Sequence, residues 1–243
     1  MPTKLQFFAE LADRQARQVT GSREGWTGFL TTAGRLYKYP FDEQLMIHAQ
    51  RPDAVACAPL ETWNNPMNRY VRRGSKGIAL IDQVSDKPRL RYVFDYADTE
   101  GGKYNPHRPF IWQMKPEYEQ VVADALKEKY QTPVSQNDVG NIIFGLAHEL
   151  AARYYYDNAS DIWGSVKGSF LEGYDEFNIS VAFCEAMTVS VAYSIMTRCG
   201  IDPAEHFKDE DFQPVFDFNT PDTVFTLGQA VSTVTGRCCT TVF

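Results

Sequence analysis

The chain has 243 residues, of which 44% are hydrophobic and 14% aromatic. This composition allows a sizeable buried core and excludes an intrinsically disordered protein. The 24 basic and 31 acidic side chains give a formal net charge of −7.

The charge is unevenly distributed along the chain. Residues 1–115 contain 17 Lys and Arg against 12 Asp and Glu, whereas residues 116–243 contain 7 against 19. This asymmetry predicts two domains, 1–115 and 116–243, and makes the basic first domain the candidate for binding a polyanion. A drift of charge along a single domain is the alternative.

The N-terminal residues and the cysteines predict a cytoplasmic protein without a membrane partner. The first ten residues contain Lys4, Gln6 and Glu10, so a signal peptide is not expected. The longest apolar stretch, 179–196, contains Glu185 and several hydroxyl residues, which is typical of a buried helix rather than a membrane span. The five cysteines form no C-x-x-C pair and are expected to be reduced thiols.

The first domain is expected to begin with helices and to continue into a small antiparallel sheet. Periodic apolar residues predict helices over 3–20, 26–37 and 42–50, the first beginning with the capping box Thr3-x-x-Gln6. Short strands are expected over 54–58 and 77–82, and "LRYVFDY" (90–96) alternates as a half-buried strand does. The predicted fold class is therefore α+β.

From Pro116 onward the sequence is predicted to be mainly helical. An apolar stripe follows Pro116, and Ser135-x-x-Asp138 is a capping sequence for the helix that contains "FGLAHELAARYYYDN" (144–158). A long apolar helix is expected from about 175 to 199, where Gly200 ends it.

Residues 63–76, "WNNPMNRYVRRGSK", combine cations with flat rings. The segment contains two large aromatic residues and four cations: Trp63, Tyr70, Arg69, Arg72, Arg73 and Lys76. Cations contact phosphates, and aromatic rings stack on unpaired bases. Arg89 and Arg91 lie downstream and are expected to extend the same face across a hairpin. The pattern permits nucleic-acid binding, but a solvated basic hairpin without a ligand explains it equally well.

The same region resembles known families. "YKYPFDEQLMIHAQRPDAVACAPLETWNN" (37–65), "RYVRRGSKGIALID" (69–82) and "RYVFDYADT" (91–99) resemble the N-terminal region of large LtrC-like proteins of conjugative elements in Firmicutes, which carry helicase- and methylase-related modules further along. More distantly, "W…VRRGSKGIAL…VFD" is similar to the single-stranded-DNA-binding domain of ArdC-type antirestriction proteins. The resemblance implies that residues 1–115 bind single-stranded DNA through Trp63, Arg69, Tyr70, Arg72, Arg73, Lys76, Arg89 and Arg91.

A second resemblance concerns residues 148–152. ArdC-type proteins also have a metalloprotease-like domain with H-E-L-A-H on a helix, and this chain has H-E-L-A-A, with Ala152 in place of the second histidine. A catalytic zinc site needs three protein ligands and one open position. His148 and Glu185 alone hold zinc poorly, and the helix phase places His148 opposite the apolar stripe.

We therefore expect residues 116–243 to form a zincin-like pseudo-metalloprotease unit without a metal or other cofactor. A divergent metal site involving His148, Glu149 and Glu185 is one alternative, and a chance match to the motif is another.

These expectations describe a non-enzymatic, mobile-element-encoded protein that binds single-stranded DNA and has an antirestriction or anti-defence role. One alternative is a direct inhibitor of a host defence nuclease, as an anti-CRISPR protein is, with the acidic half in the nuclease's nucleic-acid channel. A divergent zinc metallopeptidase is the second alternative.

Overall fold

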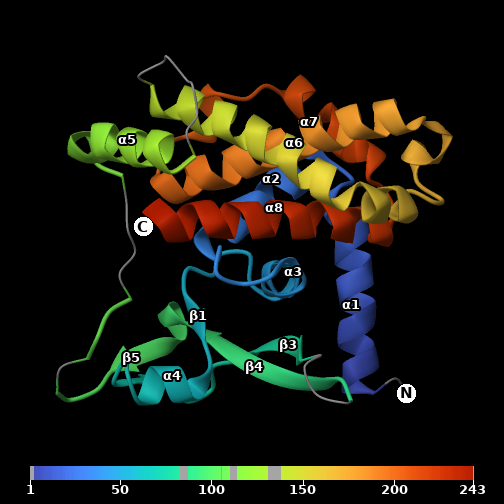
Figure 1. Cartoon of the computed structure of the whole chain (residues 1–243). Coiled ribbons are helices and arrows are strands. Elements are labelled where there is room, and N and C mark those ends of the chain that lie inside the picture. The colour runs from blue at the N-terminus through green and yellow to red at the C-terminus, as the bar shows by residue number, and fades with distance from the viewer. Residues whose placement is uncertain (1–2, 83–86, 105, 110–113, 131–137, 243) are drawn as a thin grey trace.

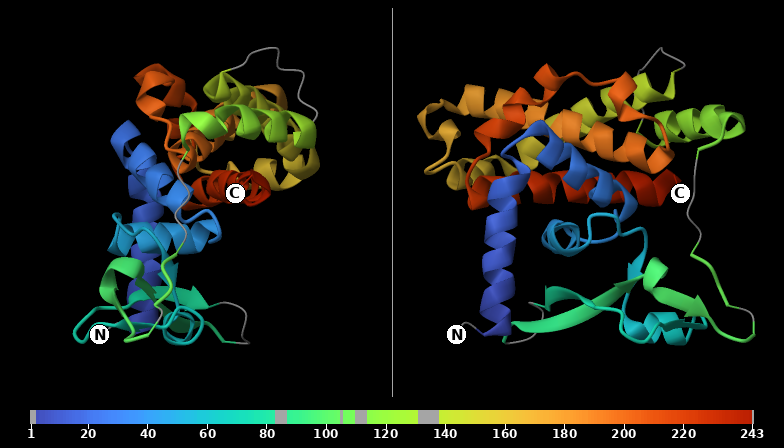
Figure 2. Two further views of the ribbon diagram at one scale, coloured as in Figure 1. Left: turned by 90° about the vertical axis from the view of Figure 1, so that its left-hand side faces the viewer. Right: turned by 180° about the vertical axis from the view of Figure 1, so that it is seen from behind.

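The structure, a computed structural model, describes residues 3–82, 87–104, 106–109, 114–130 and 138–242. A helical layer lies on one side of the protein and a small β-region on the other, with α3 (Phe41–Gln50) between them (Figures 1 and 2). The predicted α+β class, with N-terminal helices, a small antiparallel sheet and a mainly helical second half, is confirmed.

Of the two other N-terminal helices, α1 (Lys4–Val19) joins the β-region to the helical layer and α2 (Arg23–Arg35) lies within that layer. α1 begins beside the sheet and ends at the helical layer, where α2 packs on α7 (Figure 1). The predicted capping box is present: Gln6 N–H donates to Thr3 Oγ1 at 3.2 Å, and Thr3 N–H donates to Gln6 Oε1 at 2.8 Å. These bonds satisfy donors that the first turn of a helix otherwise leaves free.

The β-region contains two small antiparallel sheets. The first has the order β1 (Cys57–Ala58), β4 (Arg89–Asp95), β3 (Ile78–Asp82), and the second pairs β2 (Arg69–Val71) with β5 (Thr99–Gly101). A short helix, α4 (Leu60–Asn64), precedes β2. The sequence did not predict α4, β2 or β5, because elements of three to five residues are too short to show a hydrophobic period.

The helical layer is built around α7 (Glu176–Cys199), which packs against α2, α6 (Val139–Ser165) and α8 (Pro221–Val242). α5 (Glu119–Tyr130) lies against α6. Short 3-10 helices cover 96–98, 116–118, 170–173, 203–205 and 209–217. Gly200 ends α7 at a φ of 75°, as predicted. Asp138 itself caps α6 by accepting from Asn141 N–H at 3.0 Å, and Ser135 lies outside the described residues.

Within the described residues, α7 is the one helix whose length and composition would allow it to cross a membrane. In the structure 72% of its most apolar window is buried. Ala186, Val191 and Ala192 are fully enclosed by neighbouring helices. The position of α7 at the centre of the helical layer therefore accounts for its apolar sequence.

The hydrophobic core crosses the predicted domain boundary at residue 115. Phe29 and Phe41 belong to the same cluster of buried side chains as Leu227 in α8, and the Phe41 ring contacts Phe225 edge to face, with ring centroids 5.3 Å apart. The sheet contributes to a smaller cluster that includes Leu80. The N-terminal helices therefore share one core with residues 116–243, while the sheet packs against the other side of α3.

Close packing of α3 on α8 generates a stability prediction. A Cβ at Gly228 would lie 2.1 Å from the Phe41 ring, so Gly228→Ala should lower the free energy of unfolding by about 1–3 kcal/mol. Gly164→Ala is the matched control, because a Cβ on this α6 glycine meets nothing within 4 Å and should stabilise by up to about 1 kcal/mol. Denaturant titrations measure both, and a fully stable Gly228→Ala variant would contradict the shared core.

Candidate nucleic-acid interface

Residues 72–77 join β2 to β3 and are here called the basic turn. Gly74 adopts a φ of 91°, a conformation that favours glycine. Ser75 N–H donates to Arg72 O at 3.1 Å, and Arg72 N–H donates to Asp98 O at 2.9 Å. The backbone of the turn is thus attached to the segment that follows β4.

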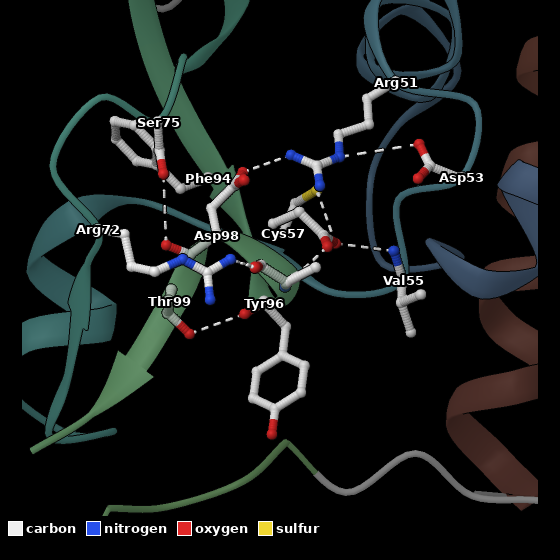
Figure 3. A network of polar contacts seen from close by, with 12 residues as sticks. Arg51, Asp53, Val55, Cys57, Arg72, Ser75, Phe94, Tyr96, Asp98 and Thr99 are labelled. Carbon is white, nitrogen blue, oxygen red and sulfur yellow. Dashed lines mark hydrogen bonds and ion pairs between the residues drawn. The ribbon is translucent and has the colours of Figure 1, made fainter.

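Two buried carboxylates, Asp95 and Asp98, hold this part of the protein together, and Figure 3 shows Asp98 beside Arg51 and Arg72. Asp95 is 1% exposed and accepts from Val55 N–H at 2.7 Å, Ala56 N–H at 2.9 Å and Ala97 N–H at 2.9 Å. Backbone donors of this kind offset the cost of removing a carboxylate from water. Asp95 therefore fixes residues 55–56 beside the end of β4.

Asp98 forms an ion pair with Arg51, whose Nη1 lies 2.5 Å from Asp98 Oδ2. The hydrogen bond to Asp98 raises the pKa of Arg51, with a smaller opposing effect of burial. Burial and the nearby Asp95 carboxylate raise the pKa of the Cys57 thiol to about 12. Cys57 is therefore a protonated, unreactive thiol at neutral pH, and this cluster acts as a structural support.

Trp63 and Arg69 are buried, which corrects their predicted placement on an exposed binding surface. Trp63 lies on α4, is 2% exposed, and donates from Nε1 to Phe94 O at 2.9 Å. Arg69 donates from Nε to Thr99 Oγ1 at 2.8 Å and lies 4.3 Å from the centre of the Tyr96 ring. A base cannot stack on Trp63 without displacing this packing, and Arg69 already has its partners inside the protein.

The other predicted residues of the segment point outward. Tyr70 is 49% exposed, and Arg72, Arg73 and Lys76 are exposed in the basic turn. Arg72 also donates from Nη2 to Ala97 O. Within the described residues, neither Arg73 nor Lys76 makes an ion pair. Of the residues predicted to bind nucleic acid, the structure therefore leaves three cations exposed in the basic turn and one aromatic residue, Tyr70, exposed beside it.

Arg89 and Arg91 do not extend this group as freely as predicted. Arg89 Nε lies 2.9 Å from Asp82 Oδ2, and Arg91 Nη2 lies 2.5 Å from Glu43 Oε1. Burial raises the pKa of Glu43, while the hydrogen bond from Arg91 opposes that rise. Both arginines already neutralise a carboxylate, so a phosphate would have to compete for them.

Sequence reasoning missed Tyr92. Its ring is 43% exposed on the face of β4 opposite the buried Val93. Gly77, the last residue of the basic turn, lies against Tyr92 and Phe94, since a Cβ there would come within 3.2 Å of both side chains. The alternation of 90–96 set the largely aromatic face of Leu90, Tyr92, Phe94 and Tyr96 against Arg91, Val93 and Asp95, and so favoured burial of the aromatic face. The structure buries Val93 and Asp95 instead and leaves Tyr92 exposed, because Asp95 accepts backbone hydrogen bonds inside the protein.

The H-E-L-A-A sequence of residues 148–152 lies on α6, away from the basic turn. His148 and Ala152 are exposed, in agreement with the predicted helix phase, whereas Ala151 is buried. His148 and Glu185 line a common hollow of about 310 Å³, together with Glu210. Glu149 is half-buried and does not line this hollow. Over the described parts of the chain, no group of three His, Cys, Asp or Glu side chains is placed to hold a metal ion.

Comparison of the chain with family models, with curated proteins and with solved structures finds no match.

The position of Trp63 generates the next prediction. Trp63→Phe should lower the free energy of unfolding by about 1–3 kcal/mol, because it removes buried volume and the hydrogen bond to Phe94 O. The folded variant should keep its affinity for oligo(dT). Tyr70→Phe is the exposed control and should unfold as the unchanged protein does. A Trp63→Phe variant with normal stability but at least tenfold weaker affinity for oligo(dT) would show that a base does stack on Trp63.

Proposed function

We propose that this chain binds single-stranded nucleic acid through the basic turn and the two tyrosines beside it, Tyr70 and Tyr92. The observation that carries the proposal is the exposed position of Arg72, Arg73 and Lys76 on a turn that is fixed by Asp98. A turn that is already ordered loses little conformational entropy on binding.

The surrounding charges favour a phosphate ligand. Three acidic residues of the β-region, Asp82, Asp95 and Asp98, accept ion pairs or hydrogen bonds from within the protein, and the exposed Glu100 lies opposite Tyr70 across the β2–β5 pair. Within the described residues neither Arg73 nor Lys76 forms an ion pair, so both can replace a counterion on a phosphate.

The exposed rings favour a single strand over a duplex. Tyr70 is 49% exposed and Tyr92 is 43% exposed, and unpaired bases can stack on such rings. Bases in a duplex already stack on one another and present only their edges, so a duplex would use the cations alone. Affinity is then expected to be higher for oligo(dT) than for a duplex of equal length.

The proposed biological role follows the resemblance to LtrC-like and ArdC-type proteins. We propose a non-enzymatic, cytoplasmic protein of a mobile element that shields transferred single strands from host restriction or other defence. Residues 116–243 are proposed to act as a degenerate zincin-like scaffold that supports the N-terminal helices through the shared core, and through α3 the sheet.

A second candidate function rests on the acidic hollow beside α6. Glu185 and Glu210 are exposed there, and Glu210 has only a 3.7 Å ion pair with Lys208. Such a surface is suited to a basic channel on a defence nuclease. Asp209 and Asp211 are less suited, because Asp209 pairs with Arg23 at 3.0 Å and Asp211 accepts from Lys208 N–H at 2.7 Å.

Neutralising the basic turn tests the first proposal. Arg73→Gln with Lys76→Gln should weaken oligo(dT) binding and reduce the slope of log affinity against log salt by about 1.4, since each single-strand phosphate contact contributes about 0.7. The matched control, Arg14→Gln with Arg17→Gln, removes two exposed cations from α1 and should change neither quantity. Equal affinity of the two double variants at several salt concentrations would refute the proposal.

Tyr92→Ala tests the stacking contribution separately. The variant should lose about 1–3 kcal/mol of binding free energy while the salt dependence stays unchanged, because no charge is removed. Fluorescence anisotropy with labelled oligo(dT) measures both quantities. A change in salt slope without a loss of affinity would contradict stacking.

Charge reversal at the acidic hollow separates the two candidate functions. Glu185→Lys with Glu210→Lys should leave oligo(dT) affinity unchanged or slightly higher, because acidic side chains repel phosphate. If the chain instead blocks a nuclease channel, the same variant should lose nuclease inhibition while it still binds DNA. Inhibition assays with defence nucleases, run beside the anisotropy measurement, distinguish these outcomes.

A further inference from the structure

Three adjoining hollows form a trough beside the C-terminal end of α8. The largest, of about 890 Å³, lies between residues 37–40, the end of α5 and α8. A second, of about 230 Å³, shares residues 37–39 with it and reaches residues 55–57. A third, of about 460 Å³, shares Tyr130 and Arg237 with the first and reaches α6. The trough is thus continuous from the β-region to α6.

The trough is basic although the chain is acidic. Six cations line it: Arg35, Lys38, Lys129, Arg153, Arg198 and Arg237. Asp157 is the one acidic residue among the side chains that line the three hollows. Residues 116–243 contain only 7 Lys and Arg against 19 Asp and Glu, and four of those seven are in the trough. This concentration attracts a polyanion that the rest of the helical half repels.

Three of these cations have room for a ligand. Lys38, Lys129 and Arg153 are exposed, and within the described residues none of them makes an ion pair. Lys38 lies 5.6 Å and Arg198 lies 5.3 Å from the centre of the Tyr37 ring, which fixes two positive charges around one aromatic side chain.

The remaining lining supplies rings and hydrogen-bonding groups. Three half-buried tyrosines, Tyr37, Tyr130 and Tyr154, line the trough together with the cations. Gln229 and Thr233 on α8 add an amide and a hydroxyl group that reach the same space. Cations with interleaved aromatic residues are typical of surfaces that follow a nucleic-acid strand.

The trough and the basic turn are attached to the same support. Val55 and Ala56 line one end of the trough and donate their N–H groups to Asp95. Asp98, three residues later, holds the basic turn through its carbonyl. The two basic surfaces are therefore placed relative to each other by one rigid cluster.

We infer that the trough is a second binding surface for single-stranded nucleic acid, which contacts the sugar–phosphate backbone of a strand already bound at the basic turn. The inference rests on the proposed function, since it assigns the trough to the same ligand. A strand long enough to reach both surfaces then binds more tightly than a short one, because the second contact is intramolecular.

A length series with matched variants tests the inference. Oligo(dT) of about 8 and about 30 nucleotides covers one binding surface and both, respectively. The trough variant carries Lys38→Gln, Lys129→Gln and Arg153→Gln. Its control carries Arg17→Gln, Lys167→Gln and Lys208→Gln, three exposed cations outside the trough. The affinities and salt slopes of both are compared with those of the unchanged protein.

The unchanged protein and the control should bind the long strand at least about tenfold more tightly than the short one. The trough variant should lose that advantage, reduce the long-strand salt slope by about 2, and keep its short-strand affinity. Equal long-strand affinity of trough variant and control would overturn the inference while leaving the proposed function intact. If the trough variant binds both lengths weakly and the Arg73→Gln, Lys76→Gln variant binds normally, the trough is the primary surface and the proposed function is wrong.

Discussion

The burial of Asp95 and Asp98 is the constraint on which the β-region depends. A buried carboxylate is costly unless it is fully hydrogen-bonded or paired. Here Val55, Ala56 and Ala97 supply backbone donors to Asp95, and Arg51 supplies its guanidinium to Asp98. Removing the Asp95 carboxylate would release residues 55–56 from the end of β4, and removing the Asp98 carboxylate would release Arg51. Both carboxylates therefore stabilise the segment whose backbone holds the basic turn.

The same constraint separates the charges. Asp95 and Asp98 face inward to their donors, whereas Arg73 and Lys76 remain at the surface. A chain with a net charge of −7 can therefore present a local basic surface. The trough is a second local basic surface. It lies where the helical half adjoins the N-terminal helices, and Lys38, Lys129 and Arg237 line the same hollow there.

The sequence predicted features that depend on local chemistry. The capping box at Thr3 and the end of α7 at Gly200 were correct, because each depends on a few neighbouring residues. Trp63 was assigned to the interface because it lies near the cations in sequence and within the stretch that resembles ArdC-type proteins. Its burial depends on Phe94, 31 residues away, and no local pattern contains that contact.

Long-range contacts also explain the other differences between the sequence predictions and the structure. Arg91 was expected to be available for phosphate, but it pairs with Glu43, 48 residues earlier. The charge asymmetry predicted two domains that meet at residue 115, but a shared core spans that position because Phe41 packs on α8. The trough was not predicted, since its cations come from α2, α5, α6, α7, α8 and the segment after α2, and only the fold brings them together.

The most direct test of the account is amide hydrogen exchange of the full chain with and without oligo(dT) of about 20 nucleotides. The account predicts slower exchange in peptides that cover residues 70–77 and 89–95 when the oligonucleotide is bound. Peptides around His148 and Glu185 should exchange at the same rate in both samples. Protection confined to the acidic hollow, or none in residues 70–77, would contradict a nucleic-acid interface at the basic turn.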